Sequence, residues 1–549
     1  MKFFIPCLLL AGLTAGCTSI PTVGLDDPEA QLPDNAGIVA IQVVSNIKKL
    51  SKQIPHWKKV IVLQASQTEA EKQQVFSIPA MDTGYTETRA FVGGLAPGTY
   101  RIAGLLGQLH TDNGTYTLSA SVPREMGRFQ VETGRLSTLG TLVFQPFDEL
   151  SRSLTESTFL ISRLPDVENL EALVKGRFPD KYSELVQVDP LDWEPDSNSE
   201  YRNAVSQLVR SHAYTANVQP PRPDGTRLIG GLLGSIFALK HGATWERHLV
   251  PTSHAITAVS TFPNGRILAG AERGQVFVSG PELDKWVAFP LPSRDGFVSH
   301  IGALTEDSWY AISDLHDSAE LWRRSFDQDW ERVAVIERDS RPSDLFDTNE
   351  LFVIESIPDN ERIADVVTIW SGESKYTFYP RRSGIQKIEV SEWDNLEQQP
   401  NGIWSGRPAG FWGSIKKPSY SIDQGDHWIE VESDAYKHKS PPFVLQRDHI
   451  VSSGHPSRLD ESLQGGRALS RSTIYGWEST SNGRRWKLLP PLPEGCTEIE
   501  RQISTRTQMF CITEDGRIMQ SSDIANSWQH ATGGRPPMNA LPVENTPQR

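Results

Sequence analysis

The chain has 549 residues, enough for two or three domains, because single hydrophobic cores stop growing at about 250 to 300 residues. Its 54 basic and 68 acidic side chains give a formal net charge of −14, and an acidic surface repels phosphate backbones, so we do not expect a nucleic-acid partner. The 42 glycines and 37 prolines, without an alanine-rich or leucine-rich helical tract, favour short strands joined by turns and thus a mainly β fold.

The first 17 residues form a segment of their own. Lys2 is its only charge, and the apolar run from Phe3 to Leu13 is shorter than the ~20 residues that span a bilayer, which favours a signal peptide over a membrane-spanning anchor. The segment ends in Leu-Thr-Ala-Gly before Cys17. This ending resembles the lipobox of bacterial lipoproteins, in which small residues precede a cysteine that carries diacylglycerol.

The resemblance implies that residues 1–16 are a removed signal peptide, that Cys17 is the lipid-attachment residue and that 17–36 form a lipidated tether. Two or three acyl chains anchor a protein firmly to a membrane. By the sorting rule of enteric bacteria, Thr18 after the cysteine favours the outer membrane. We therefore expect a lipid-anchored protein of the bacterial cell envelope, facing the periplasm or the cell surface. A plain secretory signal with an incidental cysteine is the alternative.

Residues 37–148 alternate apolar and polar positions, and this pattern predicts an antiparallel β-sandwich. Within it, the stretch from Phe91 to Ile102 contains a Pro-Gly turn flanked by Leu95 and Tyr100 as core residues. This stretch resembles the prealbumin-like and carboxypeptidase-regulatory-like sandwiches of exported proteins, which are mostly spacers and binding modules.

Residues 149–225 change to a helical period and are predicted to form a helical connector between two domains. A capping-box pattern at 197–200 precedes apolar residues spaced as on one face of a helix. A second amphipathic helix is predicted over 167–177, and proline-rich sequence ends the connector.

The last 300 or so residues contain a repeat with a period of about 45 residues and one gap of double length. Such a period normally corresponds to one four-stranded propeller blade per repeat, and the double gap hides a degenerate blade around Tyr376 to Val390. Residues 226–535 are thus predicted to form a β-propeller of seven blades, with six or eight left open, and 536–549 a flexible tail. The repeat is marked by Trp245, Trp286, Trp330, Trp428, Trp486 and Trp528.

Several of these tryptophans close turns of the type Ser-x-Asp-x-Gly-x-x-Trp, best preserved at 421–428. The turns resemble the Asp-box, or BNR repeat, of sialidase-type, sortilin-type and photosystem-assembly-type propellers. The resemblance implies structural roles: Ser and Asp bind backbone N–H groups, Gly adopts a conformation that a Cβ opposes, and Trp packs between sheets. The residues assigned to these roles are Ser421, Asp423, Gly425, Trp428, Ser479, Gly483, Trp486, Ser521, Asp523 and Trp528.

In those propeller families the boxes lie on the face away from the usual binding site. The insertion at 436–472, which lengthens one blade, is a better place for specificity, because long loops on a rigid scaffold often bind. Its candidate binding residues are His449, His455, Arg458 and Arg467.

The sequence contains neither a G-x-S-x-G nor an H-E-x-x-H motif, so we predict no catalytic residue, no metal and no cofactor. A sialidase-type glycoside hydrolase is the alternative: Arg273, Arg338 and Arg362 could bind a carboxylate, although the Arg-Ile-Pro start typical of those enzymes is missing. The favoured function is non-enzymatic binding or scaffolding through the propeller, with an envelope protein or a glycan as partner. A factor that assembles an envelope complex is a further alternative.

Two cysteines remain in the propeller, Cys496 and Cys511. In an oxidising compartment such a pair favours a disulfide. Alignment of the repeats instead places Cys511 opposite a residue near Glu500, and the remaining offset is beyond disulfide reach for extended strands. A loop that folds back would restore contact, so the bridge stays open at this point.

Overall fold

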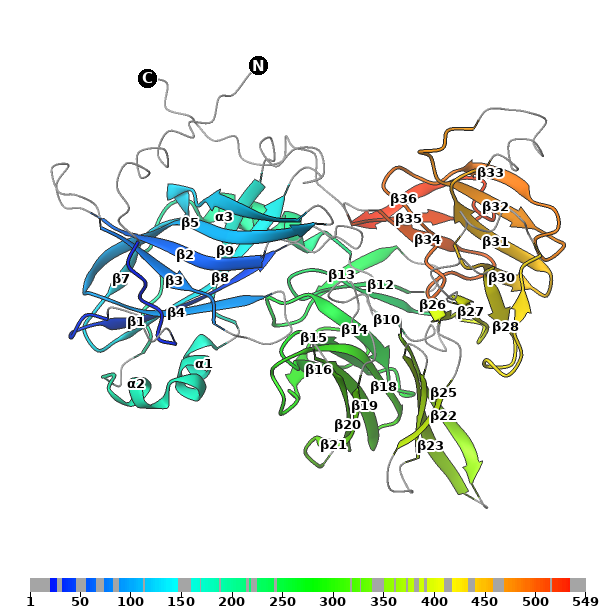
Figure 1. Cartoon of the computed structure of the whole chain (residues 1–549), viewed down its shortest axis with the longest axis horizontal. Helices are drawn as coiled ribbons and strands as arrows, with labels where there is room; N and C mark the ends of the chain where they lie inside the picture. Colours follow the sequence, from blue (N-terminus) through cyan, green and yellow to red (C-terminus); the bar gives the residue numbers. More distant parts are fainter. Residues whose placement is uncertain are drawn as a thin grey trace.

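The fold was obtained as a computed structural model (Figure 1). It contains two units, a β-sandwich with short helices (blue to cyan) and a ring of small sheets (green to red). The structure describes residues 20–26, 32–45, 56–65, 74–81, 88–111, 114–146, 159–167, 169–186, 189–213, 217–218, 225–240, 244–315, 318–325, 327–337, 350–359, 362–371, 374–379, 385–389, 393–408, 417–432, 440–457, 469–513 and 516–533.

The N-terminal unit is a β-sandwich with strand orders β4-β1-β8-β9 and β3-β2-β5-β6, and β7 pairs with β5. Leu95 and Tyr100 are fully buried between the sheets, and the Tyr100 ring stacks on Phe129 at 5.9 Å. The elements are β1 (Gly37–Ser45), β2 (His56–Gln64), β3 (Val75–Pro79), β4 (Arg89–Leu95), β5 (Gly98–Thr111), β6 (Gly114–Ser121), the short helix η3 (Arg124–Met126), β7 (Phe129–Val131), β8 (Leu136–Pro146) and β9 (Phe159–Leu164).

The sandwich differs from the sequence prediction in three respects. β1 and β8 pair in parallel, whereas every other strand pair of the sandwich is antiparallel among the described residues. The segment 20–26 was assigned to the tether, but Val23 is 1% exposed and its N–H donates to Ser77 O at 3.0 Å. β9 lies in the range assigned to the connector. It pairs with β8 and extends the sheet, and this pairing buries the apolar side chain of Ile161.

Three helices follow in the described chain: α1 (Leu170–Arg177), α2 (Pro179–Ser183) and α3 (Ser199–Arg210). α1 begins three residues later than predicted, because Asn169 is its N-cap residue and its Oδ1 accepts from Ala172 N at 3.0 Å. α3 has Asn198 as its N-cap residue and buries Val205 and Leu208. No helix among the described residues is long and apolar enough to cross a membrane.

Within the described residues the C-terminal unit contains seven small sheets, as a seven-bladed β-propeller requires. The fourth sheet includes Tyr376 and supplies the blade implied by the double gap in the repeat. In chain order the blades are β11 (Arg227–Gly230), β12 (Ser235–Leu239), β13 (Trp245–Leu249); β14 (Ile256–Thr261), β15 (Ile267–Ala271), β16 (Val276–Ser279), β17 (Trp286–Ala288); β18 (Phe297–Thr305), β19 (Ser308–Asp314), β20 (Ser318–Arg324), β21 (Glu331–Glu337); β22 (Glu350–Asp359), β23 (Arg362–Ser371), β24 (Ser374–Phe378), β25 (Ile385–Glu389); β26 (Trp393–Gln398), β27 (Trp404–Pro408), β28 (Ser419–Ser421), β29 (Ile429–Glu430); β30 (Phe443–Gln446), β31 (His449–Gly454), β32 (Tyr475–Ser479), β33 (Lys487–Pro491); and β34 (Met509–Ile512), β35 (Arg517–Ser521), β36 (Gln529–Gly533).

The end of the connector is fastened to the inner part of the ring. Ala213 pairs with Gly231 of the first blade, and its N–H donates to Gly516 O of the last blade at 3.2 Å. Further along the chain, β10 (Asn217–Val218) lies parallel to β14, with Asn217 opposite Ala258. β14 is the first strand of its blade and contacts the first strands of both neighbouring blades, so β10 covers an inner edge.

The ring closes without a shared strand in the described residues, because the first blade contains β11 to β13 and the last blade contains β34 to β36. Side chains join the two blades instead. The rings of Trp245 and Phe510 meet edge to face at 5.7 Å, and Arg227 Nη1 donates to Gln508 Oε1 at 2.9 Å. Closure therefore depends on packing and side-chain hydrogen bonds.

A buried arginine stabilises the last blade in front of β34, where the four-stranded blades have a first strand. The Arg501 side chain is 1% exposed, and its guanidinium lies 3.1 Å from Glu397 Oε2 and 3.2 Å from Glu498 Oε2. Glu397 belongs to the fifth blade, and Arg501 Nη1 also donates to Pro441 O, next to the sixth blade, at 3.4 Å. One cation thus joins three blades at the position of the missing strand.

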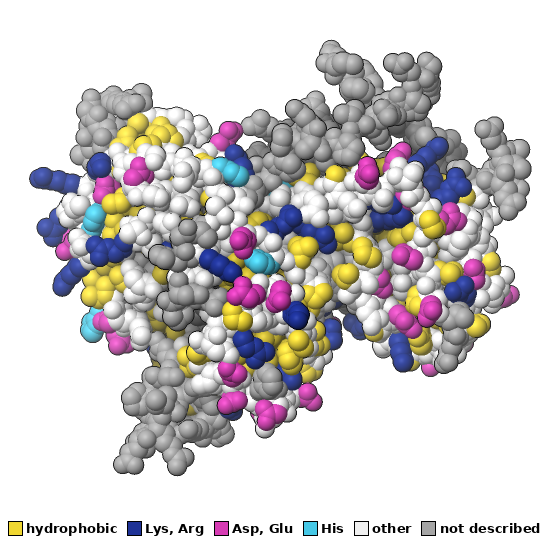
Figure 2. Space-filling model, turned by 180° about the vertical axis from the view of Figure 1, so that it is seen from behind, with side chains coloured by type: hydrophobic (Ala, Val, Ile, Leu, Met, Phe, Trp, Pro, Cys, Tyr) yellow, Lys and Arg dark blue, Asp and Glu magenta, His cyan; other side chains and the backbone are white. Residues whose placement is uncertain are grey.

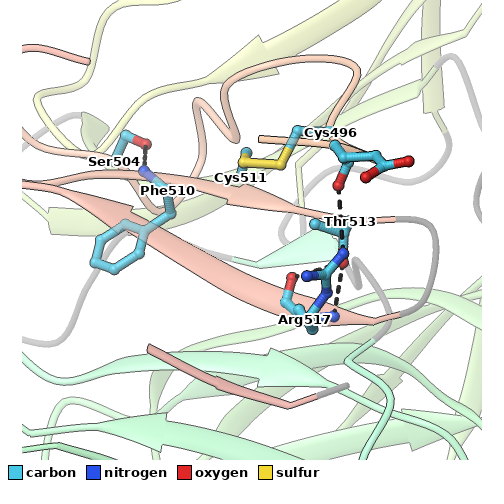
Figure 3. The surroundings of a disulfide bond; sticks show 7 residues. Cys496, Ser504, Phe510, Cys511, Thr513 and Arg517 are labelled. Atoms are coloured by element: carbon cyan, nitrogen blue, oxygen red, sulfur yellow. Dashed lines mark hydrogen bonds between the residues drawn. A yellow bond between two sulfur atoms is a disulfide. The ribbon is translucent and has the colours of Figure 1, made fainter. Parts of the chain in front are cut away.

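Cys496 and Cys511 form a disulfide in this blade (Figure 3). The repeat alignment is right that Cys511 lies near the partner of Glu500, since Glu500 N donates to Phe510 O at 2.8 Å. The argument against the bridge is nevertheless wrong, because a turn closed by Cys496 N and Pro493 O at 3.0 Å folds the chain back. The two cysteine Cα atoms are consequently 6.0 Å apart.

Removal of the Arg501 side chain should destabilise the propeller. Breaking a buried pair costs about 3 to 5 kcal/mol, and because Glu397 and Glu498 are 23% and 22% exposed, we expect about 3 kcal/mol for Arg501→Ala. Urea unfolding followed by tryptophan fluorescence measures the change. The control is Arg484→Ala, which removes an exposed pair with Glu432 and should leave the midpoint nearly unchanged. Equal midpoints for both variants would contradict the role of Arg501.

Candidate functional site

The box turn at 421–428 is held by its own polar groups. Ser421 Oγ accepts from Gly425 N at 2.8 Å and donates to Asp423 Oδ1 at 2.8 Å. Asp423 Oδ1 also accepts from His427 N at 2.9 Å, and Asp423 Oδ2 lies 2.7 Å from His427 Nδ1. Gly425 has a φ of 90°, a region that a Cβ disfavours. Each of these groups is used inside the turn.

Two further copies of the turn make similar contacts. Ser479 Oγ accepts from Gly483 N at 2.9 Å. Ser521 Oγ accepts from Ala525 N at 2.9 Å and donates to Asp523 Oδ1 at 2.8 Å. The turns therefore satisfy backbone N–H groups that would otherwise need water or a ligand.

The tryptophans that close these turns pack inside the ring. The Trp428 and Trp393 rings have centroids 3.8 Å apart in a cluster that includes the fourth and fifth blades. Trp486 packs in the cluster between the fifth and sixth blades, and Trp528 in the cluster between the sixth and seventh. Such packing uses the aromatic faces that a sugar would otherwise need for stacking.

The turns define two faces of the ring. Box turns join the third strand of a blade to the fourth, and we call the face on which they lie the box face. Because the strands of a blade alternate in direction, turns between second and third strands, and links between blades, lie on the opposite face, here called the loop face. In the first two blades the loop face contains residues 231–234, 250–255 and 272–275.

The sandwich docks on the loop face over the first two blades. Val44 and Val143 of the sandwich share one buried cluster with Leu232, Leu233 and Ala255 of the loop face. The apolar core thus continues from one unit into the other, which favours a single relative orientation.

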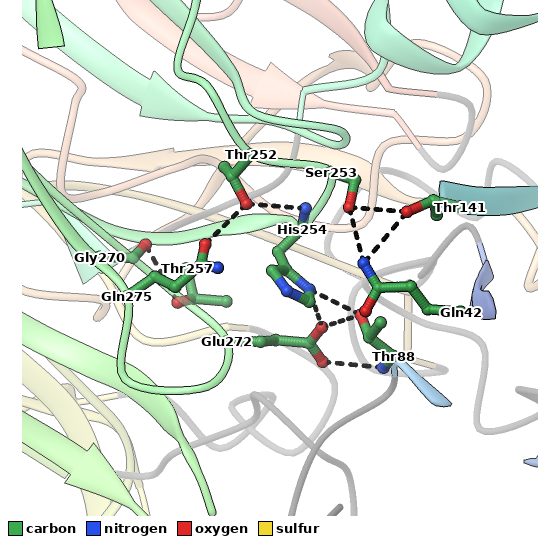
Figure 4. A network of polar contacts seen from close by, with 10 residues as sticks. All are labelled: Gln42, Thr88, Thr141, Thr252, Ser253, His254, Thr257, Gly270, Glu272 and Gln275. Atoms are coloured by element: carbon green, nitrogen blue, oxygen red, sulfur yellow. Dashed lines mark hydrogen bonds and ion pairs between the residues drawn. The ribbon is translucent and has the colours of Figure 1, made fainter. Parts of the chain in front are cut away.

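Buried polar groups extend this interface (Figure 4). Gln42 Nε2 donates to Thr141 Oγ1 at 3.1 Å and to Ser253 Oγ at 3.3 Å, and Thr141 Oγ1 donates to Ser253 Oγ at 3.1 Å. All three residues are fully buried. A hydrogen-bonded network of this kind specifies register between two surfaces, because an unpaired buried polar group is costly.

A histidine and a glutamate of the propeller lie next to this network and receive a threonine from the sandwich. Thr88 N donates to Glu272 Oε1 at 3.3 Å, and the Thr88 hydroxyl donates to Glu272 Oε2. His254 Nδ1 is 3.0 Å from Glu272 Oε2 and 2.8 Å from Thr88 Oγ1 (Figure 4). Donors from both units therefore surround a carboxylate that is 1% exposed, as a buried charge requires.

The group has the residue types of an acid–base site but not its geometry. Thr88 and Glu272 both contact the same imidazole atom, Nδ1 of His254. A hydrolytic triad instead uses one ring nitrogen for the carboxylate and the other for the hydroxyl. Thr88 and His254 are also fully buried. The arrangement is suited to docking two units. The sequence patterns did not point to it, because its members come from segments that share no motif.

The candidate loop residues are separated by the structure. His449 begins β31 at the box face, where its Nε2 lies 3.0 Å from Glu478 Oε1. His455 follows the other end of the same strand and is exposed on the loop face. Arg458 and Arg467 lie outside the described residues, so a binding loop at 436–472 stays a prediction.

The arginines considered for a sialidase-type site do not converge in the described chain. Arg273 lies in a loop-face turn, whereas Arg362 begins β23 next to a box-face turn, and Arg338 lies outside the described residues. No group of three or more His, Cys, Asp or Glu side chains in the described ranges could hold a metal ion.

Asp423 should give the box turn a pH-dependent stability. The N–H of His427, the Ser421 hydroxyl and the His427 ring lower the pKa of Asp423 from 3.8 to about 2. Because the folded state lowers this pKa, the stabilisation is complete above about pH 4 and is lost as the pH falls toward 2. The difference in Tm between the native chain and Asp423→Asn should shrink over that range. Asp426→Asn, a neighbouring exposed substitution, is the control and should show no such change.

Thr88→Val should loosen the contact between the two units. The substitution removes the hydroxyl donor to buried Glu272, and an unsatisfied buried group costs about 1 to 3 kcal/mol. Hydrogen exchange in 252–257 should accelerate, and the unfolding midpoint should fall. Thr117→Val, on an exposed strand position of the sandwich, is the matched control. Unchanged exchange in Thr88→Val would contradict a docking role.

No protein family and no curated protein sequence matches the chain. Similar solved structures include "YCF48 bound to D1 peptide" (14% identity, covering 56% of this chain and 93% of that chain, TM-score 0.37) and YCF48 from Cyanidioschyzon merolae (12%, 57% and 96%, 0.37). A GH74 xyloglucanase from Xanthomonas campestris is also similar (13%, 59% and 67%, 0.29). The likeness is one of fold, and at this level it carries no argument about ligand, partner or activity.

Proposed function

We propose that the chain is a lipid-anchored protein of the bacterial cell envelope whose propeller acts as a non-enzymatic binding scaffold. The docked interface carries this proposal. The sandwich covers the loop face over the first two blades, and Thr88 encloses the His254–Glu272 pair. The side chains of Thr88, His254 and Glu272 therefore hold the sandwich and the propeller in one orientation, and they are not accessible to a substrate.

The disulfide supports the assignment to the envelope. A bond such as Cys496–Cys511 persists in the periplasm or outside the cell and is rare in the reducing cytosol. The lipobox-like sequence before Cys17 gives the point of attachment, and Thr18 favours the outer membrane. Together these features support the proposal that the propeller works in an oxidising compartment at a membrane surface.

The partner class that fits best is an envelope protein. The part of the loop face beyond the sandwich is carried by a ring of sheets, and a preformed surface lowers the entropic cost of binding a folded partner. A role in assembling an envelope complex would be one form of this scaffolding. Binding of a glycan remains the second form that the proposal includes.

Cys17→Ala should release the protein from the membrane without changing its binding. In bacteria that express each form, the native chain should take up labelled fatty acid and sediment with the membranes, whereas Cys17→Ala should remain soluble, because two or three acyl chains supply the anchoring. Chemical crosslinking followed by capture should recover the same envelope protein with both forms when the soluble form is present in the periplasm.

Ser19→Ala, a small change beside the cysteine, is the control and should sediment like the native chain. Membrane association of Cys17→Ala would refute the anchor. Failure to recover a partner, together with release of a fluorogenic sialoside by the purified protein, would instead favour the glycoside hydrolase.

A further inference from the structure

Three arginines of the sandwich project from one side of a sheet. Tyr100 and Phe129 face each other in the β5–β7 pair, and both are fully buried in the core. Side chains alternate along a strand, so Arg101, which follows Tyr100 in β5, lies on the outer side of the sheet, and Arg128 directly precedes Phe129 at the start of β7. Arg124 follows in η3, close enough to Arg101 for their charges to interact.

None of the three makes an ion pair with a residue that the structure describes, whereas nearby Arg163 lies 2.9 Å from Asp196. Burial, together with repulsion from Arg124 and Arg128, lowers the pKa of Arg101. The neighbouring acid on the outer side, Glu194, accepts from Gln130 and not from this cluster. The cluster is therefore complementary to an anion outside the chain.

The cluster lies at the end of the sandwich remote from the propeller. β1 runs from the remote end of the sandwich to the docked end. Val44, near the last residue of β1, packs on the loop face. Gly37, the first residue of β1, lies against β7, since a Cβ at this position would be only 2.8 Å from the Val131 side chain. β7 has three residues and ends at Val131, so Arg128, which directly precedes it, lies within one short strand of this remote end.

The chain enters the sandwich at the same end. Gly24 bridges to Gly93, which in turn pairs with Val39 near the start of β1. The carbonyl O of Pro21 accepts from Ser77 N at 2.9 Å, so this residue is held at the sheet. Three residues lie between Cys17 and Pro21, so their Cα atoms can be at most about 14 Å apart. A lipid on Cys17 would thus hold the remote end against the membrane.

We propose that the arginine cluster (Arg101, Arg124 and Arg128) binds the phosphates of anionic lipid headgroups in the membrane that holds the anchor. The inference rests on the proposed lipid attachment at Cys17. The guanidinium fork matches phosphate geometry, and basic groups next to an acyl anchor add to membrane affinity. With a net charge of −14, and acidic and basic side chains interspersed over the surface in Figure 2, a local cluster would orient the molecule.

The test uses the chain from Thr18 onward, which contains every described residue and has no lipid of its own. It should sediment with vesicles of phosphatidylcholine and phosphatidylglycerol at low salt, and not with phosphatidylcholine alone. Replacing Arg101, Arg124 and Arg128 together by Gln should weaken this binding by on the order of 100-fold. If that variant fails to fold by near-UV circular dichroism, Arg124→Gln with Arg128→Gln, both at exposed positions, replaces it.

The matched control replaces Arg447, Arg485 and Arg506 by Gln, which makes the same change in charge at exposed box-face positions. This control should bind like the native chain. Equal binding to both kinds of vesicle, or an equal loss in the control, would overturn the proposal. Saturable binding of inorganic phosphate without vesicle binding would overturn it in favour of a soluble ligand. Failure of Cys17 to take up fatty acid is scored separately and leaves the vesicle result unaffected.

Discussion

The need to close a ring without a shared strand governs much of this structure. An open ring would expose the apolar sides of its first and last blades, at about 25 cal/mol for each Å² left in water. The chain meets this need with the Trp245–Phe510 contact and the hydrogen bond from Arg227. The disulfide adds to closure by fixing the segment that enters the last blade. The blades between them need only pack on their neighbours.

Two of the buried charged residues, Arg501 and Glu272, join segments that are distant in sequence. Arg501 joins the last three blades, and Glu272 joins the propeller to Thr88 of the sandwich. The cost of desolvating such charged groups offsets much of the free energy that their ion pairs contribute. Loss of a partner is nevertheless strongly destabilising, because it leaves a buried charge unpaired. A wrong relative position of the blades or units would leave a charge unpaired. These two residues therefore specify arrangement more than they add stability.

The architecture could be predicted where the sequence repeats. The tryptophan period favoured seven blades, with six or eight left open, because most blades share the same turn and packing residue and the double gap indicates one degenerate blade. The sandwich was predicted from alternation, but neither the parallel pairing of β1 with β8 nor the packing of Val23 follows from local pattern, since both depend on strands far away in sequence. The docking group has no repeat or motif at all. His254, Glu272 and Thr88 come together only through the relative placement of two folded units.

The connector between the units has a consequence for how force would pass through the molecule. Ala213 is paired with the first blade and Asn217 with the second, soon after helix α3 ends. The docked surfaces therefore meet at a high effective concentration, so a modest interface is enough to keep them together. Under the proposed lipid attachment at Cys17, pulling on the anchored end would load the interface and the paired connector in parallel. The molecule would then tilt on the membrane as one rigid arm rather than bend at a hinge.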